Sequence, residues 1–207
     1  MSLIILDMGS GNGQGNEIAY QKKAIDTIAG MDSKKHQVIL KYQLEIADDP
    51  PNKHLDREVF REAYQYGHIK GYDVTSSVFD DSSLDFLLGF ITPFIKIACR
   101  PDLYPLIQKI EPRMPVMVSI AGRVILPIHC MFLHCVPKYP ADMIQYEGNF
   151  AENMLKATVS DHVQGLQLWN KYHPVIWEKH FVLERDANNP DAGVFAITPD
   201  QLKEVIG

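Results

Sequence analysis

The stretch KATVSDHVQGLQLWNKYHPVIWEKHFV, residues 156–182, decides the fold. It begins with a short run rich in β-strand formers, KATVSD at 156–161, and ends with another, PVIWEKHFV at 174–182. The residues between them, 164–173, have the apolar spacing of a helix. A strand, a helix and a second strand in this order indicate a βαβ unit, whose two strands run parallel.

The same alternation continues along the whole chain. Short apolar, β-branched runs are predicted as strands at 3–8, 36–43, 72–79, 94–99, 115–121, 130–136, 156–161 and 174–182. Eight βα units in series predict an α/β fold, a compact (β/α)8 TIM barrel. The segment 122–129 is short and interrupted by proline, so we expect an abbreviated fifth helix connection. An open doubly wound sheet is the alternative.

Helices are predicted between these strands. Asn16 is expected to be the N-cap of the first of them. The expected helices are 17–31, 56–70, 83–90, 102–110, a short one near 149–155, 164–173 and 199–206.

Composition indicates one folded domain over residues 1–207. Apolar residues make up 46% of the chain, and no linker or low-complexity segment divides it. The 20 basic and 26 acidic residues give a net charge of −6, which offers no basic field for nucleic acid or an anionic membrane. The longest apolar run, 124–136, is shorter than the roughly 20 residues of a membrane helix. With three cysteines in no disulfide pattern, a cytoplasmic location is expected.

The stretch HCMFLHCVPKYP at 129–140 concentrates two histidines and two cysteines. Side chains on a strand alternate between its faces, so His129 and Cys135 would share one face while Cys130 and His134 take the other. The four side chains therefore cannot converge on one ion, and the segment is interpreted as a strand rather than a metal site.

The expected barrel places chemistry at the C-terminal ends of its strands. Lys41 and Lys96 lie near two of these ends within apolar sequence, and two lysines with hydroxyl groups between them suit a phosphate or carboxylate. Pairing with nearby acids is the alternative for each lysine. The other polar residues expected at strand ends are Gln43, Ser76, Ser77, Cys99, Ser119, Ser160 and Glu178.

Two histidines end the seventh and eighth strands. His162 and His180 would be lateral neighbours in a barrel, because adjacent strands lie about 4.8 Å apart. Two neutral imidazoles, completed by water and substrate oxygens, suit Mn²⁺, Zn²⁺ or Mg²⁺. A hydrogen-bonded core role for one histidine remains the alternative.

The glycine-rich segment GSGNGQGN at 9–16 follows a strand and precedes a helix, as a dinucleotide-binding loop does. Its glycine spacing does not satisfy G-x-G-x-x-G, because Gln14 and Asn16 occupy the third-glycine positions. A flexible first βα loop above Asp7 is the favoured interpretation.

Several segments, in order, resemble the sialic acid (N-acetylneuraminate) synthase family. They are ILKYQ at 39–43, SSVF at 76–79, FIKIACRPDL at 94–103, LHCVPKYP at 133–140, VSDHVQG at 159–165, VIWEKHFVLERDANNPD at 175–191 and ITPDQL at 197–202. The resemblance covers nearly the whole chain and implies the same barrel.

The resemblance also implies an activity, the condensation of phosphoenolpyruvate with N-acetylmannosamine or its 6-phosphate to a nine-carbon sialic acid, with release of phosphate. It implies a divalent metal, Mn or Mg, on His162 and His180. It implies roles for the remaining site residues as follows: Asp7, Lys41, Lys96 and His180 in catalysis, and Gln43, Ser77, Ser119, Tyr139, Ser160 and Asp191 in substrate binding.

The sequence departs from the family pattern at several positions. Gly11 and Asn12 replace an Asn-His pair, Cys99 replaces a serine, and Pro137 replaces a Ser or Asn, so polar contacts are lost or weakened. The sequence ends at Gly207 without the family's C-terminal antifreeze-like domain, which contributes an arginine to the partner's sugar site. A barrel without that domain is expected to complete the site otherwise, for example with a separate antifreeze-like chain, or to accept another aldehyde. A homodimer would then form through barrel contacts.

Three hypotheses follow from the sequence. The first is a metal-dependent synthase, and the second is a barrel that binds phosphoenolpyruvate, sugar and metal without turnover. The third is a Schiff-base lyase or aldolase, which requires Lys41 or Lys96 to be a desolvated amine.

Overall fold

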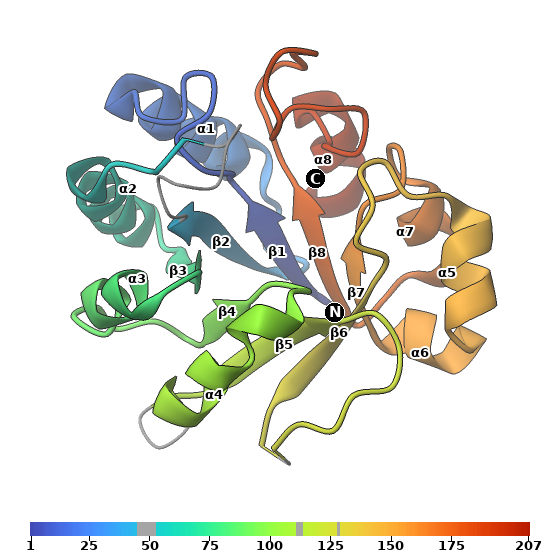
Figure 1. Cartoon of the computed structure of the whole chain (residues 1–207). Coiled ribbons are helices and arrows are strands. Elements are labelled where there is room, and N and C mark those ends of the chain that lie inside the picture. Colours follow the sequence, from blue (N-terminus) through green and yellow to red (C-terminus); the bar gives the residue numbers. More distant parts are fainter. Residues whose placement is uncertain (45–52, 111–113, 128) are drawn as a thin grey trace.

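The strands close into a parallel barrel (Figure 1) in a computed structural model that describes residues 1–44, 53–110, 114–127 and 129–207. The strands are β1 (Leu3–Asp7), β2 (Gln37–Leu44), β3 (Asp73–Val78), β4 (Ile95–Ile97), β5 (Val116–Ile120), β6 (Met131–Cys135), β7 (Thr158–Asp161) and β8 (Ile176–His180). Each pairs with the next in chain order, and β1 pairs in parallel with β8. The predicted (β/α)8 barrel is confirmed, and the open sheet is wrong because no edge separates β1 from β8.

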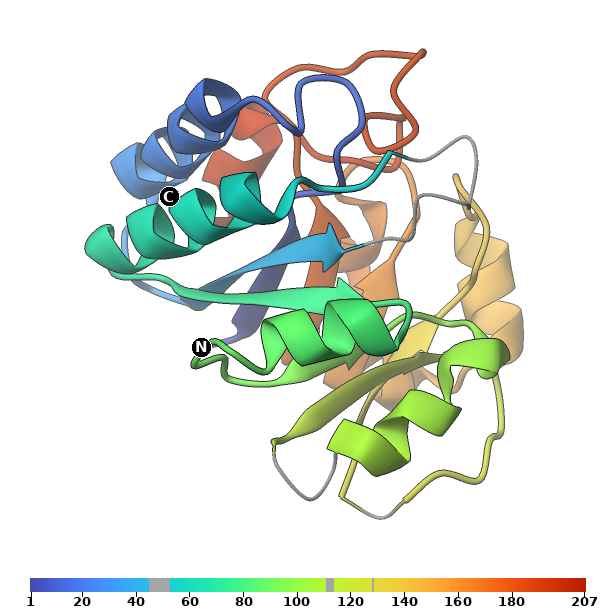
Figure 2. The same ribbon diagram turned by 60° about the vertical axis from the view of Figure 1, so that its left-hand side comes forward.

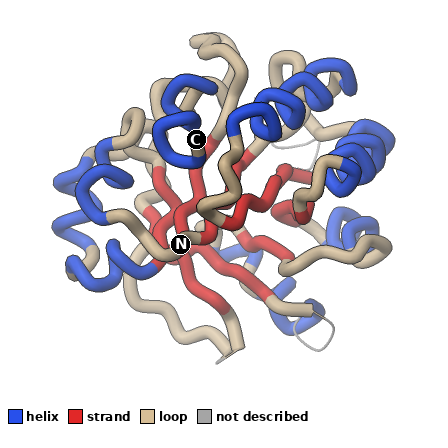
Figure 3. Tube along the Cα trace, turned by 180° about the vertical axis from the view of Figure 1, so that it is seen from behind, coloured by secondary structure: helices blue, strands red, loops and turns tan. Residues whose placement is uncertain are grey.

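Helices surround the barrel, as the view from behind shows most clearly (Figure 3). They are α1 (Ile18–Met31), α2 (Arg57–Ile69), α3 (Asp81–Leu87), the 3₁₀ turn η1 (Pro101–Leu103), α4 (Pro105–Ile110), α5 (Met143–Asn149), α6 (Glu152–Ala157), α7 (Gln167–Tyr172) and α8 (Pro199–Ile206). The expected helices are present, and α5 is an addition that the sequence analysis did not predict.

The start of α1 differs from the prediction. Glu17 precedes the helix, and no side chain caps it. The Asn16 amide instead donates to the His54 carbonyl at 2.8 Å and accepts from the Asp56 N–H at 2.6 Å. The N-cap prediction is wrong because Asn16 ties the first loop to the segment that leads into α2.

The fifth connection is abbreviated as predicted. Between β5 and β6 the described residues form no helix, and the chain runs outside the barrel as an extended loop (Figures 1 and 2). Ile128 within this loop lies outside the described residues.

The apolar core has two parts on opposite sides of the strand wall. The larger part fills the layer between strands and helices. A smaller cluster of Ile5, Ile39, Phe94, Met117 and Leu133 fills the inside of the barrel. Because this cluster plugs the interior, the barrel is no open channel.

Strand alternation then sets which residues face inward beyond this plug. Two positions beyond the plug residues Ile5, Ile39 and Met117, the inward faces carry Asp7, Lys41 and Ser119. The barrel therefore changes from an apolar plug to a polar layer along its axis. Among the described residues, no helix is long and apolar enough to cross a membrane.

Candidate active site

A cavity of about 330 Å³ opens at the C-terminal end of the barrel. Its walls come from all eight strands and the turns that follow them. The lining residues are Asp7, Lys41, Gln43, Ser77, Phe79, Lys96, Ala98, Cys99, Arg100, Ser119, Cys135, Pro137, Tyr139, Ser160, His162, Glu178 and His180. All the residues with a predicted catalytic, binding or metal role except Asp191 line this cavity, whereas Ser76 of the expected strand ends does not.

Asp7 and Lys41 form a buried ion pair on one side of the cavity. They are register partners on β1 and β2, and Lys41 Nζ lies 2.5 Å from Asp7 Oδ2. The same carboxylate oxygen accepts from Gln43 Nε2 at 2.8 Å, and Asp7 Oδ1 accepts from the Gly9 N–H at 3.0 Å. The side chains of the pair are each only 4% exposed, so the charges attract each other with little screening by water.

Glu178 lies between the two lysines. Its oxygens are 3.6 Å from Lys41 Nζ and 3.6 Å from Lys96 Nζ, and Ser160 Oγ donates to it at 2.7 Å. Lys96 also donates to Ser119 Oγ at 2.7 Å and to its neighbour's carbonyl at 3.0 Å. These contacts link β2, β4, β5, β7 and β8 across the barrel interior.

The two lysines differ in their acid–base behaviour. Burial alone would lower the pKa of Lys41, but Asp7 and Glu178 outweigh burial and raise it. Burial lowers the pKa of Lys96, and Glu178 offsets this only in part. Lys41 is therefore the permanent cation, whereas Lys96 loses its proton more readily than an ordinary lysine.

Both carboxyl groups are held ionised. Burial opposes the charge on Asp7, but Lys41 and then His180 outweigh it and lower the pKa. Burial also opposes the charge on Glu178, but Lys41 and Lys96 lower its pKa. Such carboxylates are weak proton acceptors at neutral pH, so the geometry assigns them to holding the lysines in place.

His162 directly follows β7 and His180 ends β8, and their ring centroids lie 5.9 Å apart. His162 Nδ1 lies 2.9 Å from the Val136 carbonyl, which fixes it as the N–H side of the ring and leaves Nε2 with its lone pair. Burial lowers the pKa of His162 well below the ordinary value, so the ring is neutral at neutral pH. His180 Nδ1 is buried without a hydrogen-bond partner among the described residues.

These imidazoles fit a divalent metal. Neutral rings with an available nitrogen are the ligand form of histidine, and a buried nitrogen without a partner is the kind of atom that a ligand satisfies. Among the described residues, no group of three or more His, Cys, Asp or Glu side chains has the arrangement of a metal site. The chain itself would thus supply two ligands, with water and substrate supplying the rest.

Tyr139 covers the two histidines. Its ring lies 4.0 Å from the His162 ring at 30° and 5.0 Å, edge-on, from Phe195 of the loop after β8. Tyr139 is 55% exposed, and its ring contacts both imidazoles, so it lies between them and solvent on one side of the cavity. Helix α5, which was not predicted, positions the backbone of His162 through Tyr146. The Tyr146 hydroxyl donates to the Ser160 carbonyl and accepts from the His162 N–H.

The sequence profile of the NeuB family matches residues 16–207. The chain belongs to the NeuB family. No curated protein gives a significant match to this sequence.

Several solved structures share this fold. N-acetylneuraminic acid synthetase from Leptospira borgpetersenii, solved with citrate, shares 19% identity and superimposes with a TM-score of 0.71 over 98% of this chain and 80% of that one. The spore coat polysaccharide biosynthesis protein of Bacillus subtilis shares 22% identity, with a TM-score of 0.72 over 99% and 66%. A DAHP synthase from Thermotoga maritima shares 9% identity, with a TM-score of 0.73 over 99% and 67%. At these identities the likeness establishes the fold.

Asp191 occupies a different place from the other predicted residues of this NeuB-family chain. Its Oδ2 accepts from Ser10 N–H at 3.0 Å, from Ser10 Oγ at 2.9 Å and from Asn12 Nδ2 at 3.2 Å. A β-carbon on Gly9 would approach Asp191 Oδ2 to 2.8 Å, so glycine permits this contact. Asp191 lies in the loop after β8, and its carboxylate therefore holds that loop against the glycine-rich loop at 9–16.

The sequence analysis expected Glu178 at the end of the eighth strand but gave it no chemical role, and it did not single out Arg100 or Phe79. Glu178 shares a strand face with His180 two positions on, and that alternation was a signal for its inward direction. Arg100 and Phe79 lie in the turns after β4 and β3, where no strand alternation predicts which way a side chain points. Arg100 pairs with Asp102 at 2.9 Å and lies 6.0 Å from the Phe79 ring, so it adds a third cation at the cavity wall.

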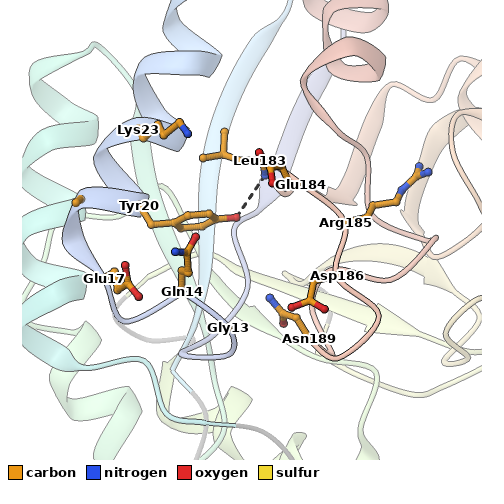
Figure 4. A pocket seen from close by; sticks show the side chains of 11 residues that line it. Gly13, Gln14, Glu17, Tyr20, Lys23, Leu183, Glu184, Arg185, Asp186 and Asn189 are labelled. Atoms are coloured by element: carbon orange, nitrogen blue, oxygen red, sulfur yellow. Dashed lines mark hydrogen bonds between the residues drawn. The ribbon is translucent and has the colours of Figure 1, made fainter.

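A second cavity, of about 540 Å³, lies outside the barrel mouth between the start of α1 and the loop after β8 (Figure 4). Tyr20 reaches across it, and its hydroxyl accepts from the Leu183 N–H at 3.3 Å. Its charged side chains are of both signs: Glu17, Lys23, Glu184, Arg185 and Asp186. No predicted site residue lines this second cavity.

Proposed function

We propose that this chain condenses phosphoenolpyruvate with N-acetylmannosamine or its 6-phosphate to form a nine-carbon sialic acid and inorganic phosphate. One observation carries the proposal: two lysines and the hydroxyl groups of Ser77, Ser119 and Ser160 converge with two imidazoles in a single barrel cavity. Membership of the NeuB family and the fold shared with a sialic acid synthase support it.

The lysine side of the cavity would hold phosphoenolpyruvate. Lys96 and Ser119, 2.7 Å apart, present a cation and a hydroxyl to the same space, and Lys41 lies 3.3 Å from Ser77 Oγ. Point charges with adjacent directional donors suit the phosphate and carboxylate of this substrate. Because these groups are in place before substrate arrives, they can stabilise developing negative charge without reorganising.

The histidine side would hold the sugar. A divalent ion on His162 and His180, Mn²⁺ or Mg²⁺, would polarise the aldehyde oxygen for attack by C3 of phosphoenolpyruvate. Tyr139 would limit the access of water there, since its ring lies over the His162 ring and contacts the His180 ring edge-on. Asp7 Oδ2 lies 3.5 Å from His180 Nε2 and would orient that ring while it holds Lys41. After water adds at C2, loss of phosphate completes the reaction.

The test is phosphate release from phosphoenolpyruvate with Mn²⁺. N-acetylmannosamine and its 6-phosphate are supplied separately, each with and without EDTA. Release that needs a sugar and stops with chelator is the expected result, and the sugar that supports it identifies the substrate. Lys96→Gln should abolish release, whereas Lys109→Gln, which removes a surface cation paired with Asp81, should not.

Two results would overturn the synthase. If calorimetry detects phosphoenolpyruvate binding but no sugar supports release, the chain is a binding barrel. If pyruvate and borohydride trap a stable adduct on a barrel lysine, the Schiff-base hypothesis replaces it.

A further inference from the structure

The second cavity, between the start of α1 and the loop after β8, has no part in the proposed condensation (Figure 4). Its volume of about 540 Å³ exceeds the volume of about 330 Å³ of the barrel cavity, and small-molecule sites occupy about 300–1,000 Å³. Tyr20 spans the cavity from α1, and the hydrogen bond from the Leu183 N–H at 3.3 Å holds its ring there. The phenolic proton has no acceptor among the described residues, so it is left for a ligand.

Two side chains of the loop after β8 are also held in place with one polar group left over. Asn189 Oδ1 accepts from the Asp191 N–H at 3.0 Å, which leaves the amide N–H₂ as a donor. Asp186 Oδ1 accepts from the Asn188 N–H at 2.9 Å, which leaves Oδ2 as an acceptor. A β-carbon on Gly13 would collide with Asn189 Nδ2, so glycine lets this amide lie against the first loop. These groups are therefore in position before a ligand arrives.

The two facing walls of the cavity carry the same kinds of polar group. Gln14 and Glu17 lie on the side of α1. Asp186 and Asn189 lie across from them in the loop after β8, and Tyr20 reaches between the walls. Each wall thus combines an amide, which donates and accepts hydrogen bonds, with a carboxylate, which accepts them. Neither carboxylate forms an ion pair within the described part of the chain.

We propose that this cavity is an accessory binding site for an uncharged pyranose sugar. Each hydroxyl group of such a sugar both donates and accepts, so the rim of the sugar ring matches amides and carboxylates on two facing walls. The C–H face of the sugar is apolar and packs on an aromatic face, which Tyr20 supplies. Because the ring and the loop side chains are already held, little conformational entropy is lost when the sugar binds.

Other ligand classes match the cavity less well. A phosphate or carboxylate only accepts hydrogen bonds, and it would meet three carboxylates against two cations. One of these cations, Arg185, already donates to Gln201 Oε1 at 2.8 Å and to the Ala196 carbonyl at 3.3 Å. Among the described residues, no group of three or more acidic, His or Cys side chains is arranged for a metal ion. A flat nucleobase gains from aromatic rings on both faces, whereas Tyr20 is the one aromatic side chain among the described lining residues.

The experiment measures binding of the methyl α-glycosides of glucose, mannose and galactose to the full chain, by saturation-transfer NMR and by calorimetry. These probes carry no charge and no free aldehyde, so they cannot be substrates of the proposed condensation. The outcome therefore does not depend on whether the chain is a synthase. At least one of the three glycosides should bind saturably.

Two variants assign the binding to this cavity. Gln14→Ala removes an exposed amide that bonds no described residue, and it should weaken binding by about 5-fold, as expected for one lost hydrogen bond. Tyr20→Leu should weaken binding by about 10-fold, because the aromatic face is lost. The matched controls Gln108→Ala on α4 and Tyr64→Leu on α2 should bind the glycoside as the wild type does.

Three results would overturn the site or its ligand class. Binding of none of the glycosides would overturn the site. Wild-type affinity in Gln14→Ala and Tyr20→Leu would show that the sugar binds elsewhere, and Gln14→Ala decides alone if the other variant does not fold. The class is tested by displacement of the bound glycoside, which glucose should achieve at a lower concentration than glucose 6-phosphate or adenosine. The opposite order would assign the cavity to an anion or a nucleoside.

Discussion

Replacement of Asp7 by asparagine tests whether the buried charge pair organises the site. Asp7→Asn keeps the shape of the side chain but removes its charge, and it can set an amide N–H₂ against the Lys41 ammonium. Lys41 Nζ lies 2.5 Å from Asp7 Oδ2, and both side chains are 4% exposed, so Lys41 would be left as a desolvated cation.

The expected loss in the free energy of unfolding depends on the groups that remain around Lys41. Removal of one partner of a buried ion pair costs about 3–5 kcal/mol, because the other charge stays buried. Glu178 Oε2 remains 3.6 Å from Lys41 Nζ, so we expect the lower end, a loss of about 3 kcal/mol. With an m-value of about 3 kcal/mol/M, the urea midpoint would fall by about 1 M.

Urea denaturation at neutral pH measures this loss, with Asp26→Asn as the matched control. Asp26 pairs with Lys70 at 2.6 Å on the surface, where the side chains are 48% and 34% exposed. Water solvates both groups when that pair is broken, so the control should shift the midpoint far less. A shift for Asp7→Asn no larger than the control's would refute the reasoning.

The pH dependence supplies a second test. The pKa of Asp7 is lowered in the folded protein, so its contribution is present above its unfolded pKa of about 4 and is lost as the pH falls through the folded value. The pKa of Lys41 is raised, so its contribution is complete below about 10.5 and is lost as the pH rises through the folded value. The difference in stability between wild type and variant should therefore be constant between these limits and shrink on either side. A difference that did not change with acidification would contradict the assignment.

Further predictions concern the proposed chemistry. Because burial lowers the pKa of Lys96, phosphoenolpyruvate affinity should begin to fall at a pH below the ordinary lysine value, and calorimetry across alkaline pH would show whether it does. His180→Ala should abolish Mn²⁺-dependent phosphate release, whereas the surface control His68→Ala should retain it; an active His180 variant would remove the assigned role. Arg100→Met should weaken phosphoenolpyruvate binding by about 10-fold, as expected for the loss of a hydrogen bond to a charged group, while Arg123→Met should not. Equal affinities in those two variants would place Arg100 outside the substrate site.

The strand pattern determined most of the architecture. Each predicted strand lies within a residue or two of its position in the barrel, because alternating β-branched runs and helical segments leave few topologies open. The abbreviated fifth connection was also predictable, since a short segment with proline cannot form a normal helix. Helix α5 was missed because Met143–Asn149 follows a turn and is too short for a strong periodic signal.

The sequence predicted most of the residues that line the site, but only some of the contacts between them. Period-two alternation and the strand ends brought Lys41, Lys96, His162 and His180 to one mouth, and all four line the cavity. Asp191 shows the limit of this reasoning, because it belongs to a loop whose path no periodicity fixes. Its carboxylate binds the first βα loop through Ser10.

By itself, the sequence determined the number of strands, the parallel order and the polar end of the barrel, since local spacing encodes these features. Tertiary structure alone decided which charges pair: Asp7 contacts Lys41 and His180 because closure places β1 between β2 and β8. It also decided that Glu178 lies between two lysines. Those contacts join residues far apart in the chain, and they exist only because a closed barrel converges its strands on one axis.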